Sequence, residues 1–255
     1  METNTINARK DGLRASYDRE AIQYDERRYH SAEGRLFNEM ETSVLRSWLP
    51  LASGIRVLDM PAGTGRLSLT LAETGAEVVG VDISANMLGM ALLKKPTQGH
   101  RRASFAQGSG VQLPFADDTF DAVVSFKFFH LIPNEKKPQF IREMARVLKP
   151  GKAMVVEFNS PYYGGILAWL RYTFRKKHSG GMRMKCIFPD QISVLFEGLE
   201  VTRSQGVKLP FSSALAAVLG RSAADGLNRW VGSLPAVKYF SYALIVEARK
   251  PAYGQ

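Results

Sequence analysis

The sequence contains little cysteine and histidine and no long apolar run, and each shortage excludes a class of protein. Its single cysteine, Cys186, cannot form an intramolecular disulfide, which is typical of a reducing compartment. No run approaches the roughly eighteen apolar residues of a spanning helix, and the first residues lack the apolar core of a signal peptide. We therefore expect a cytoplasmic protein without a metal site, since the four histidines lie too far apart for zinc ligands: His30, His100, His130 and His178.

Acidic residues are absent from one long stretch of an otherwise mixed chain. The net charge is +10, and no carboxylate occurs between Glu157 and Asp190. Such a basic segment is typical of proteins that bind nucleic acid, an anionic membrane surface or an acidic substrate. The apolar residues of 166–174 are interleaved imperfectly with the charges, so a solvated helix and a membrane-surface helix both fit. The six basic residues of this stretch are Arg171, Arg175, Lys176, Lys177, Arg183 and Lys185.

The hydrophobic pattern predicts one α/β domain over residues 1–255. Apolar residues at three- and four-residue steps predict helices within 1–50, and from Ile55 strands and helices alternate, which favours a parallel sheet covered on both faces. Four segments are expected: a helical one over 1–50, a core over 51–160, a basic insertion over 161–187 and a C-terminal one over 188–255 with an apolar stretch 209–234. The expected strands are 55–60, 77–83, 103–107, 120–126, 152–159, 199–207 and 239–246, with helices at 65–73, 84–94, 135–149 and from 189.

A glycine-rich stretch marks a binding site for a nucleotide-like cofactor. Residues 57–66 read V-L-D-M-P-A-G-T-G-R, which is a hydrophobic strand, a tight loop and the start of a helix. Asp82 lies nineteen residues after Gly63, at the end of the next predicted strand, where a carboxylate can accept both hydroxyls of a ribose.

The missing features of the dinucleotide pattern indicate which cofactor is bound. Ser68 stands where NAD enzymes have a third glycine or alanine, and no Gly-Lys-Ser/Thr step follows the loop, which excludes a phosphate-binding loop. Asp59 ends the strand directly before the loop, where its charge would repel a pyrophosphate but attract the ammonium and sulfonium of S-adenosyl-L-methionine. We therefore expect this cofactor, with S-adenosyl-L-homocysteine as its product.

Two later motifs strengthen this interpretation. Residues 112–125 read Q-L-P-F-A-D-D-T-F-D-A-V-V-S, and residues 146–152 read R-V-L-K-P-G-K. Together with the glycine loop they resemble the class I S-adenosylmethionine-dependent methyltransferases of the type 11 methyltransferase-domain group. Members of that group often have a cysteine at the position of Ala62. The resemblance covers about residues 50 to 160. It implies a Rossmann-like, doubly wound sheet of seven strands, the last antiparallel, with helical lid insertions.

The resemblance also implies which residues hold the cofactor. Asp59 would orient the methionine end beside the glycine loop, and Asp82 would accept the ribose hydroxyls. Gln107-Gly108-Ser109 stands where many relatives have Gly-Asp-Ala, so Gln107 or Ser109 must replace the acid at the adenine edge. Tyr24 would either contact the cofactor from a lid or only pack in the core. The complete expected set is Tyr24, Asp59, Pro61, Ala62, Gly63, Gly65, Arg66, Asp82, Ile83, Met87, Gln107, Gly108, Ser109 and Phe126.

The catalytic group is less clearly marked. Methyl transfer requires an aligned nucleophile and, where that nucleophile carries a proton, a base. His130 follows the fourth predicted strand, and an ordinary pKa of about 6.5 suits proton abstraction near neutrality. A histidine that only packs at a turn fits equally well, and Glu157, Tyr162 and Tyr163 are weaker candidates.

The methyl acceptor is expected to be apolar or lipid-like. The segments 166–185 and 209–234 are two apolar covers, and an oxygen or nitrogen atom of a small acceptor between them would receive the methyl group. The basic charges of 166–185 also predict contact with an anionic membrane surface. RNA is the competing acceptor, although the chain lacks an Asn-Pro-Pro-Tyr motif and a second cysteine. A regulatory module that binds the cofactor without catalysis stays open.

Overall fold

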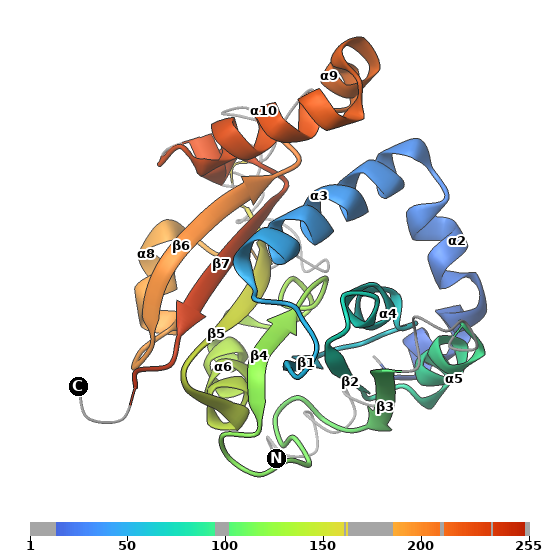
Figure 1. The fold of residues 1–255 in the computed structure, drawn as a ribbon, viewed down its shortest axis with the longest axis vertical. Coiled ribbons are helices and arrows are strands. Elements are labelled where there is room, and N and C mark those ends of the chain that lie inside the picture. Colours follow the sequence, from blue (N-terminus) through green and yellow to red (C-terminus); the bar gives the residue numbers. More distant parts are fainter. Residues whose placement is uncertain are drawn as a thin grey trace, which may run out of the picture.

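A seven-stranded sheet in the order β3-β2-β1-β4-β5-β7-β6 forms the centre of the computed structural model (Figure 1). Residues 14–94, 102–160, 162, 186–209, 212–235 and 237–252 are described by the structure. The pairs among β3, β2, β1, β4 and β5 are parallel, whereas β7 is antiparallel to both β5 and β6. This is the predicted topology. The strands are β1 (Arg56–Asp59), β2 (Glu77–Asp82), β3 (Ala103–Gln107), β4 (Phe120–Ser125), β5 (Leu148–Asn159), β6 (Glu200–Val207) and β7 (Ala243–Arg249).

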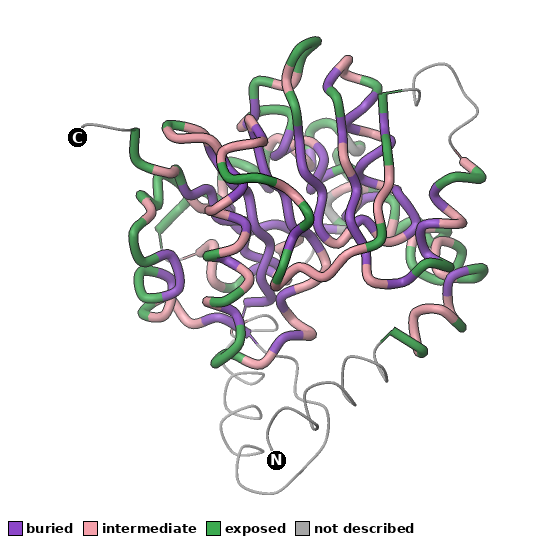
Figure 2. The backbone as a smooth tube through the Cα atoms, turned by 90° about the horizontal axis from the view of Figure 1, so that it is seen from below, coloured by how far each residue is buried: buried purple, intermediate pink, exposed green. Residues whose placement is uncertain are grey.

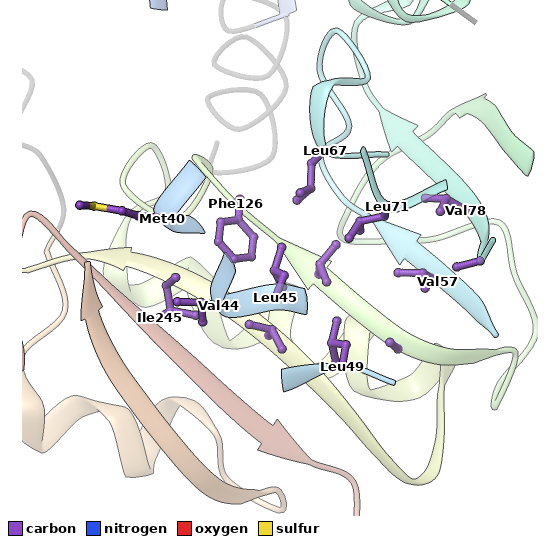
Figure 3. Close-up of a cluster of buried hydrophobic side chains, with 14 of the residues drawn as sticks. Met40, Val44, Leu45, Leu49, Val57, Leu67, Leu71, Val78, Phe126 and Ile245 are labelled. Atoms are coloured by element: carbon purple, nitrogen blue, oxygen red, sulfur yellow. The ribbon is translucent and has the colours of Figure 1, made fainter. Parts of the chain in front are cut away.

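Helices cover both faces of the sheet because successive residues of each strand point to opposite sides. Val57 of β1 belongs to the hydrophobic cluster with α3 and α4 (Figure 3). The next residue, Leu58, belongs to the cluster with α6 and α8 on the other face. Buried positions therefore gather in the central strands (Figure 2). The helices are α2 (Tyr24–Tyr29), α3 (Ala32–Trp48), α4 (Arg66–Ala72), α5 (Ala85–Lys94), α6 (Lys137–Val147), α8 (Pro189–Leu195), α9 (Ser212–Leu219) and α10 (Arg221–Ser233), with 3-10 turns η1 (Ala21–Gln23), η3 (Asn134–Lys136) and η4 (Val237–Phe240).

The N-terminal region is helical, as predicted, but it is divided. Ser31 caps α3, since its hydroxyl accepts a hydrogen bond from the Gly34 amide at 2.9 Å. One side of α3 is buried against the sheet, where Val44 and Leu45 lie beside Ile245 of β7 (Figure 3). The segment before Ser31 leaves the sheet and crosses to the ends of β1 and β2. Among the described helices, none is long and apolar enough to cross a bilayer.

Two strands begin four residues away from the predicted position. The last strand begins at Ala243 instead of Tyr239, because η4 occupies the intervening residues and the Ser241 hydroxyl donates to the carbonyls of Lys238 (2.5 Å) and Ala243 (2.7 Å). Strand β5 begins at Leu148 rather than Lys152, with a register shift opposite Phe120–Ala122. Both differences arise from local turns that hydrophobic alternation does not reveal.

Candidate cofactor pocket

A pocket lies at the carboxyl ends of β1, β2 and β4, which meet at one edge of the sheet because these strands are parallel. The N-terminal helices form its opposite wall. Its lining residues come from four regions of the sequence: Tyr17, Tyr24, Tyr29, Asp59, Pro61, Ala62, Gly63, Thr64, Arg66, Leu67, Asp82, Ile83, Met87, Phe126, Lys127, Phe128 and Leu131.

The glycine loop can turn here only because its second glycine carries no side chain. Gly65 has a φ of 75°, in the left-handed region, and a Cβ atom there would lie 2.6 Å from Cβ of Ala91. Because Ala91 is part of α5, the loop packs directly against that helix. The helix α4 starts at the next residue, Arg66. Gly65 itself supports the loop from behind and is not among the lining residues.

Asp82 is held at the pocket wall by the loop that it faces. Its carboxylate accepts hydrogen bonds from the backbone amides of Gly63 (2.8 Å) and Ser84 (2.9 Å), and the residue is 8% exposed. Burial raises the pKa of Asp82, and the backbone hydrogen bonds oppose that rise. Each carboxylate oxygen has a second lone pair, so Asp82 can still accept hydroxyl donors from the pocket.

Asp59 is a buried acid whose environment favours a cation. It is 1% exposed, and Oδ2 accepts a hydrogen bond from the Ser68 hydroxyl at 2.6 Å. Burial raises the pKa of Asp59 to about 7, although Ser68 and the charge of Arg66 oppose the rise. A cationic group bound in the pocket, such as an ammonium group, would lower this pKa and favour the ionised carboxylate. Ser68, which replaces the third glycine of the dinucleotide pattern, therefore holds Asp59 in place.

Three tyrosines of the N-terminal segment form the wall opposite the glycine loop. The rings of Tyr17 and Tyr24 lie 6.2 Å apart, and those of Tyr24 and Tyr29 lie 6.5 Å apart, in edge-to-face contacts. Burial raises the pKa of Tyr17 to about 12, so its hydroxyl stays protonated at neutral pH. The sequence pattern placed Tyr24 at the site but not Tyr17 and Tyr29, although Tyr17, like Tyr24, directly precedes an aspartate.

Polar contacts fasten this wall to the rest of the pocket. Asp25 accepts a hydrogen bond from the Thr64 hydroxyl at 2.5 Å and pairs with Lys94 of α5. Asp18 accepts a hydrogen bond from the Ser84 hydroxyl. The N-terminal segment is thus bound to the glycine loop and to the residues after β2, and its tyrosines line the pocket. Its role as a lid stays a prediction.

The end of the pocket beyond β4 contains apolar side chains beside a buried cluster of charges. Lys127 has a φ of 55°, and its ammonium group pairs with Glu41 of α3 and with Glu157 of β5 at 3.3 Å. Arg66 pairs with the same Glu41 at 3.5 Å and lies over the ring of Tyr29. Burial raises the pKa of Glu41 against the pull of both cations. No sequence motif indicated this cluster, because its members come from four separate elements.

The structure brings together ten of the fourteen predicted cofactor residues, and four lie outside the lining. Gly65 lies behind the loop, and Ser109 is in a bridge with Gln112. The side chain of Gln107 donates to the carbonyl of Ile83 at 3.0 Å, and the Gly108 amide donates to the carbonyl of Asp82. These residues support the strand ends that flank the pocket.

His130 also lies outside the pocket lining. Burial, together with the positive charges of Lys127, Arg28 and Lys137, lowers its pKa to about 4. The imidazole is therefore neutral at pH 7 and is a weaker base than an exposed histidine. The catalytic role of His130 stays a prediction.

The two segments expected to cover the acceptor differ in what the structure describes. The basic stretch 166–185, with Tyr163, lies outside the described residues. In the apolar stretch 209–234, Val218 and Trp230 are 81% and 65% exposed, so these side chains do not line a pocket.

Comparison with known proteins places the central region of the chain. Residues 57–151 match the family model described as "Methyltransferase domain". The demethylmenaquinone methyltransferase of Corynebacterium urealyticum is 42% identical over 122 residues, which are 47% of this chain and 49% of that protein. The demethylmenaquinone methyltransferase of Renibacterium salmoninarum is 35% identical over 174 residues, 64% of this chain and 66% of that protein. The chain thus spans about half to two thirds of the lengths of these relatives.

A solved structure shows the same fold over nearly the whole chain. Magnesium protoporphyrin IX methyltransferase from Synechocystis PCC 6803 superposes with a TM-score of 0.67 at 19% identity, covering 94% of this chain and 99% of that one. The fold likeness therefore extends to the N-terminal helices and to β6 and β7, well beyond the matched residues 57–151.

Proposed function

Residues 57–151 form a class I S-adenosylmethionine-dependent methyltransferase domain, and we propose that the chain uses it to methylate a small, lipid-like acceptor of the quinone type. The family and the cofactor predicted from the glycine loop are confirmed by the match. The acceptor class is proposed because the curated relatives are named demethylmenaquinone methyltransferases. The observation that carries the proposal is a pocket with two acids at one end and apolar rings at the other.

The residues at the acidic end fit the cofactor. Asp82 has free lone pairs that can accept hydrogen bonds from ribose hydroxyls. Burial raises the pKa of Asp59, and a bound cation would favour its ionised form. Ile83 and Met87 offer apolar contacts for an adenine ring beside Asp82. S-adenosylmethionine supplies a methyl group that is already activated by its positive sulfur. The chain therefore has to hold the acceptor in line with that group and keep water out.

The other end supports the proposed acceptor. Phe126, Phe128 and Leu131 follow β4 and present apolar surface to the pocket, and the tyrosine wall closes it from the opposite side. Flat rings of this kind pack well against an aromatic acceptor. Arg66 and Lys127 are the cations of this end, and both are held by Glu41, so the region combines apolar surface with a fixed polar edge.

His130 remains our proposed proton acceptor where the acceptor atom carries a proton. An imidazole with a low pKa is a weak base. It would therefore serve a methyl acceptor whose own proton is acidic. Enol-type and phenol-type hydroxyls meet that condition, and amines do not.

The proposal is tested by measuring methyl transfer with labelled S-adenosylmethionine. A short-chain demethylated naphthoquinol is offered as acceptor, and transfer RNA is offered in parallel. We expect label in the quinol and none in the RNA. NMR of the product identifies whether a hydroxyl oxygen or a ring carbon of the quinol receives the methyl group. Labelled RNA, or no labelled lipid-like acceptor at all, would overturn the proposal.

A further inference from the structure

The helices α9 and α10 expose an unusual concentration of large apolar side chains. Eleven such residues are exposed in the described region of the chain, and six of them lie between residues 218 and 240. Trp230 is the largest of these side chains and is 65% exposed. We call this set the α9–α10 patch: Val218, Leu219, Leu227, Trp230, Leu234 and Phe240.

Three members of the patch lie along one side of α10, which cannot turn to bury them. Leu227 and Trp230 of α10 and Leu234, its C-cap residue, are three and four residues apart and therefore share this side. The opposite side is docked on the sheet, since a Cβ atom at Gly232 would lie 2.2 Å from the carbonyl oxygen of Gly206 in β6. Asn228 is buried on that side and accepts a hydrogen bond from the Ser212 hydroxyl at 2.7 Å.

The patch lies at the edge of the sheet that carries the cofactor pocket. Strand β6 runs parallel to β5, because both are antiparallel to β7, and α9 follows the carboxyl end of β6 (Figure 1). Helix α10 is tied to α3, whose Ser43 hydroxyl donates to Asp225 at 3.2 Å. A surface that contacts the patch therefore meets the molecule on the side where the acceptor must enter.

The charge around the patch is positive. Residues 208–238 contain four basic residues and one acidic residue, so this stretch is positive although Arg229, which is half exposed, pairs with Asp225 at 3.4 Å. The basic stretch 163–185 lies outside the described residues, whereas Asn159 at the end of β5 and Ile187 lie together at this edge, since the Ile187 amide donates to the carbonyl of Asn159 at 3.2 Å. The positive charge of residues 208–238 would attract an anionic surface to the patch.

We propose that the α9–α10 patch docks the protein on the surface of an anionic phospholipid bilayer. The apolar stripe would enter the boundary between headgroups and acyl chains, with Trp230 at the level that tryptophan favours and the basic residues among the lipid phosphates. The inference deepens the proposed function, because a lipid-like acceptor is dissolved in the bilayer. Its test needs no acceptor and no activity.

The test compares two matched triple variants by co-sedimentation with vesicles. L227S/W230S/L234S removes the stripe, and I22S/L92S/L93S removes three exposed apolar residues elsewhere on the surface. Vesicles are made of phosphatidylcholine alone or with added phosphatidylglycerol. We expect the wild type to bind the anionic vesicles and the control variant to bind them equally well. The affinity of the stripe variant should be lower by about tenfold or more. Binding should weaken as salt rises.

Three outcomes would overturn the inference. Equal binding by the stripe variant would assign membrane contact to segment 161–185 alone. If the wild type bound neither kind of vesicle, a bilayer would be excluded as the partner of the patch. A wild-type dimer in light scattering that becomes monomeric in the stripe variant, without vesicle binding, would show that a second copy covers the patch. Methyl transfer to a water-soluble acceptor is measured separately, so loss of activity with vesicle binding intact would count only against the proposed function.

Discussion

The two ends of the pocket are stabilised in different ways. At the cofactor end, Asp82 is held by amides of Gly63 and Ser84, and Asp59 by Ser68, so the contacts that hold the two acids join residues at most nineteen positions apart. At the acceptor end, Lys127 depends on Glu41 and Glu157, which are 86 and 30 positions away. Short-range contacts leave a motif in the sequence and long-range contacts do not. The comparison also predicts that damage at the acceptor end affects stability first, and damage at the cofactor end affects binding first.

The largest expected effect is on folding, from K127M at the acceptor end. The substitution leaves Glu41 and Glu157 buried without Lys127, which costs about 3–5 kcal/mol of unfolding free energy. Chemical denaturation measures this loss. The double variant E41Q/K127M removes one of the stranded charges and should recover a large share of it. A single variant as stable as the wild type would show that the charge cluster does not hold α3 on the sheet.

At the cofactor end, D82A should weaken binding of S-adenosylhomocysteine by about 2–3 kcal/mol, because the charged partner of the ribose hydroxyls is lost. Isothermal titration calorimetry measures the affinity. D82N, which keeps the shape and one acceptor oxygen, should lose less. Unchanged affinity in D82A would contradict the assignment of Asp82 to the ribose.

A pH series distinguishes the two acids of the cofactor end. Because the pKa of Asp59 is about 7 in the free protein, this carboxyl is protonated at pH 6 and must lose its proton to hold a cation. Affinity for S-adenosylmethionine should therefore fall by up to about tenfold per pH unit below pH 7 and be level above it. D59N should remove this slope, whereas E41Q should keep it. The same slope in D59N would assign the pH dependence to another group.

The raised pKa of Asp59 also sets the direction of a stability change. A carboxyl that binds its proton more tightly when folded than when unfolded makes the free protein lose stability as pH rises from about 4 to about 7. D59N should flatten that decline in thermal unfolding, and the added cofactor should reverse it in the wild type by binding the ionised form.

The cofactor end could be predicted well because its contacts are local. Alternating apolar residues and a glycine loop locate β1, α4 and β2 to within about two residues, and the acid after each strand falls in the pocket. The predicted start of β7 was wrong because the 3-10 turn η4 precedes the strand, and the serine turn that follows η4 leaves no hydrophobic pattern in the sequence. Lys127 was missed as a site residue because its partners are set by tertiary packing. The exposure of Trp230 could not be predicted, since an apolar helix face looks the same whether it is buried or not.

The smallest expected effect concerns Gln107, which the sequence placed at the adenine edge. In the structure its side chain donates to the carbonyl of Ile83 and lies outside the pocket lining, so Q107A removes a support of the strand end and no contact with the cofactor. Calorimetry should show a loss of about 0.5–1 kcal/mol in affinity for S-adenosylhomocysteine, well below that of D82A. A loss as large as that of D82A would mean that Gln107 turns to the adenine when the cofactor binds. The cofactor end would then be rearranged by its ligand, and the contrast between a locally built end and a remotely built end would hold only for the free protein.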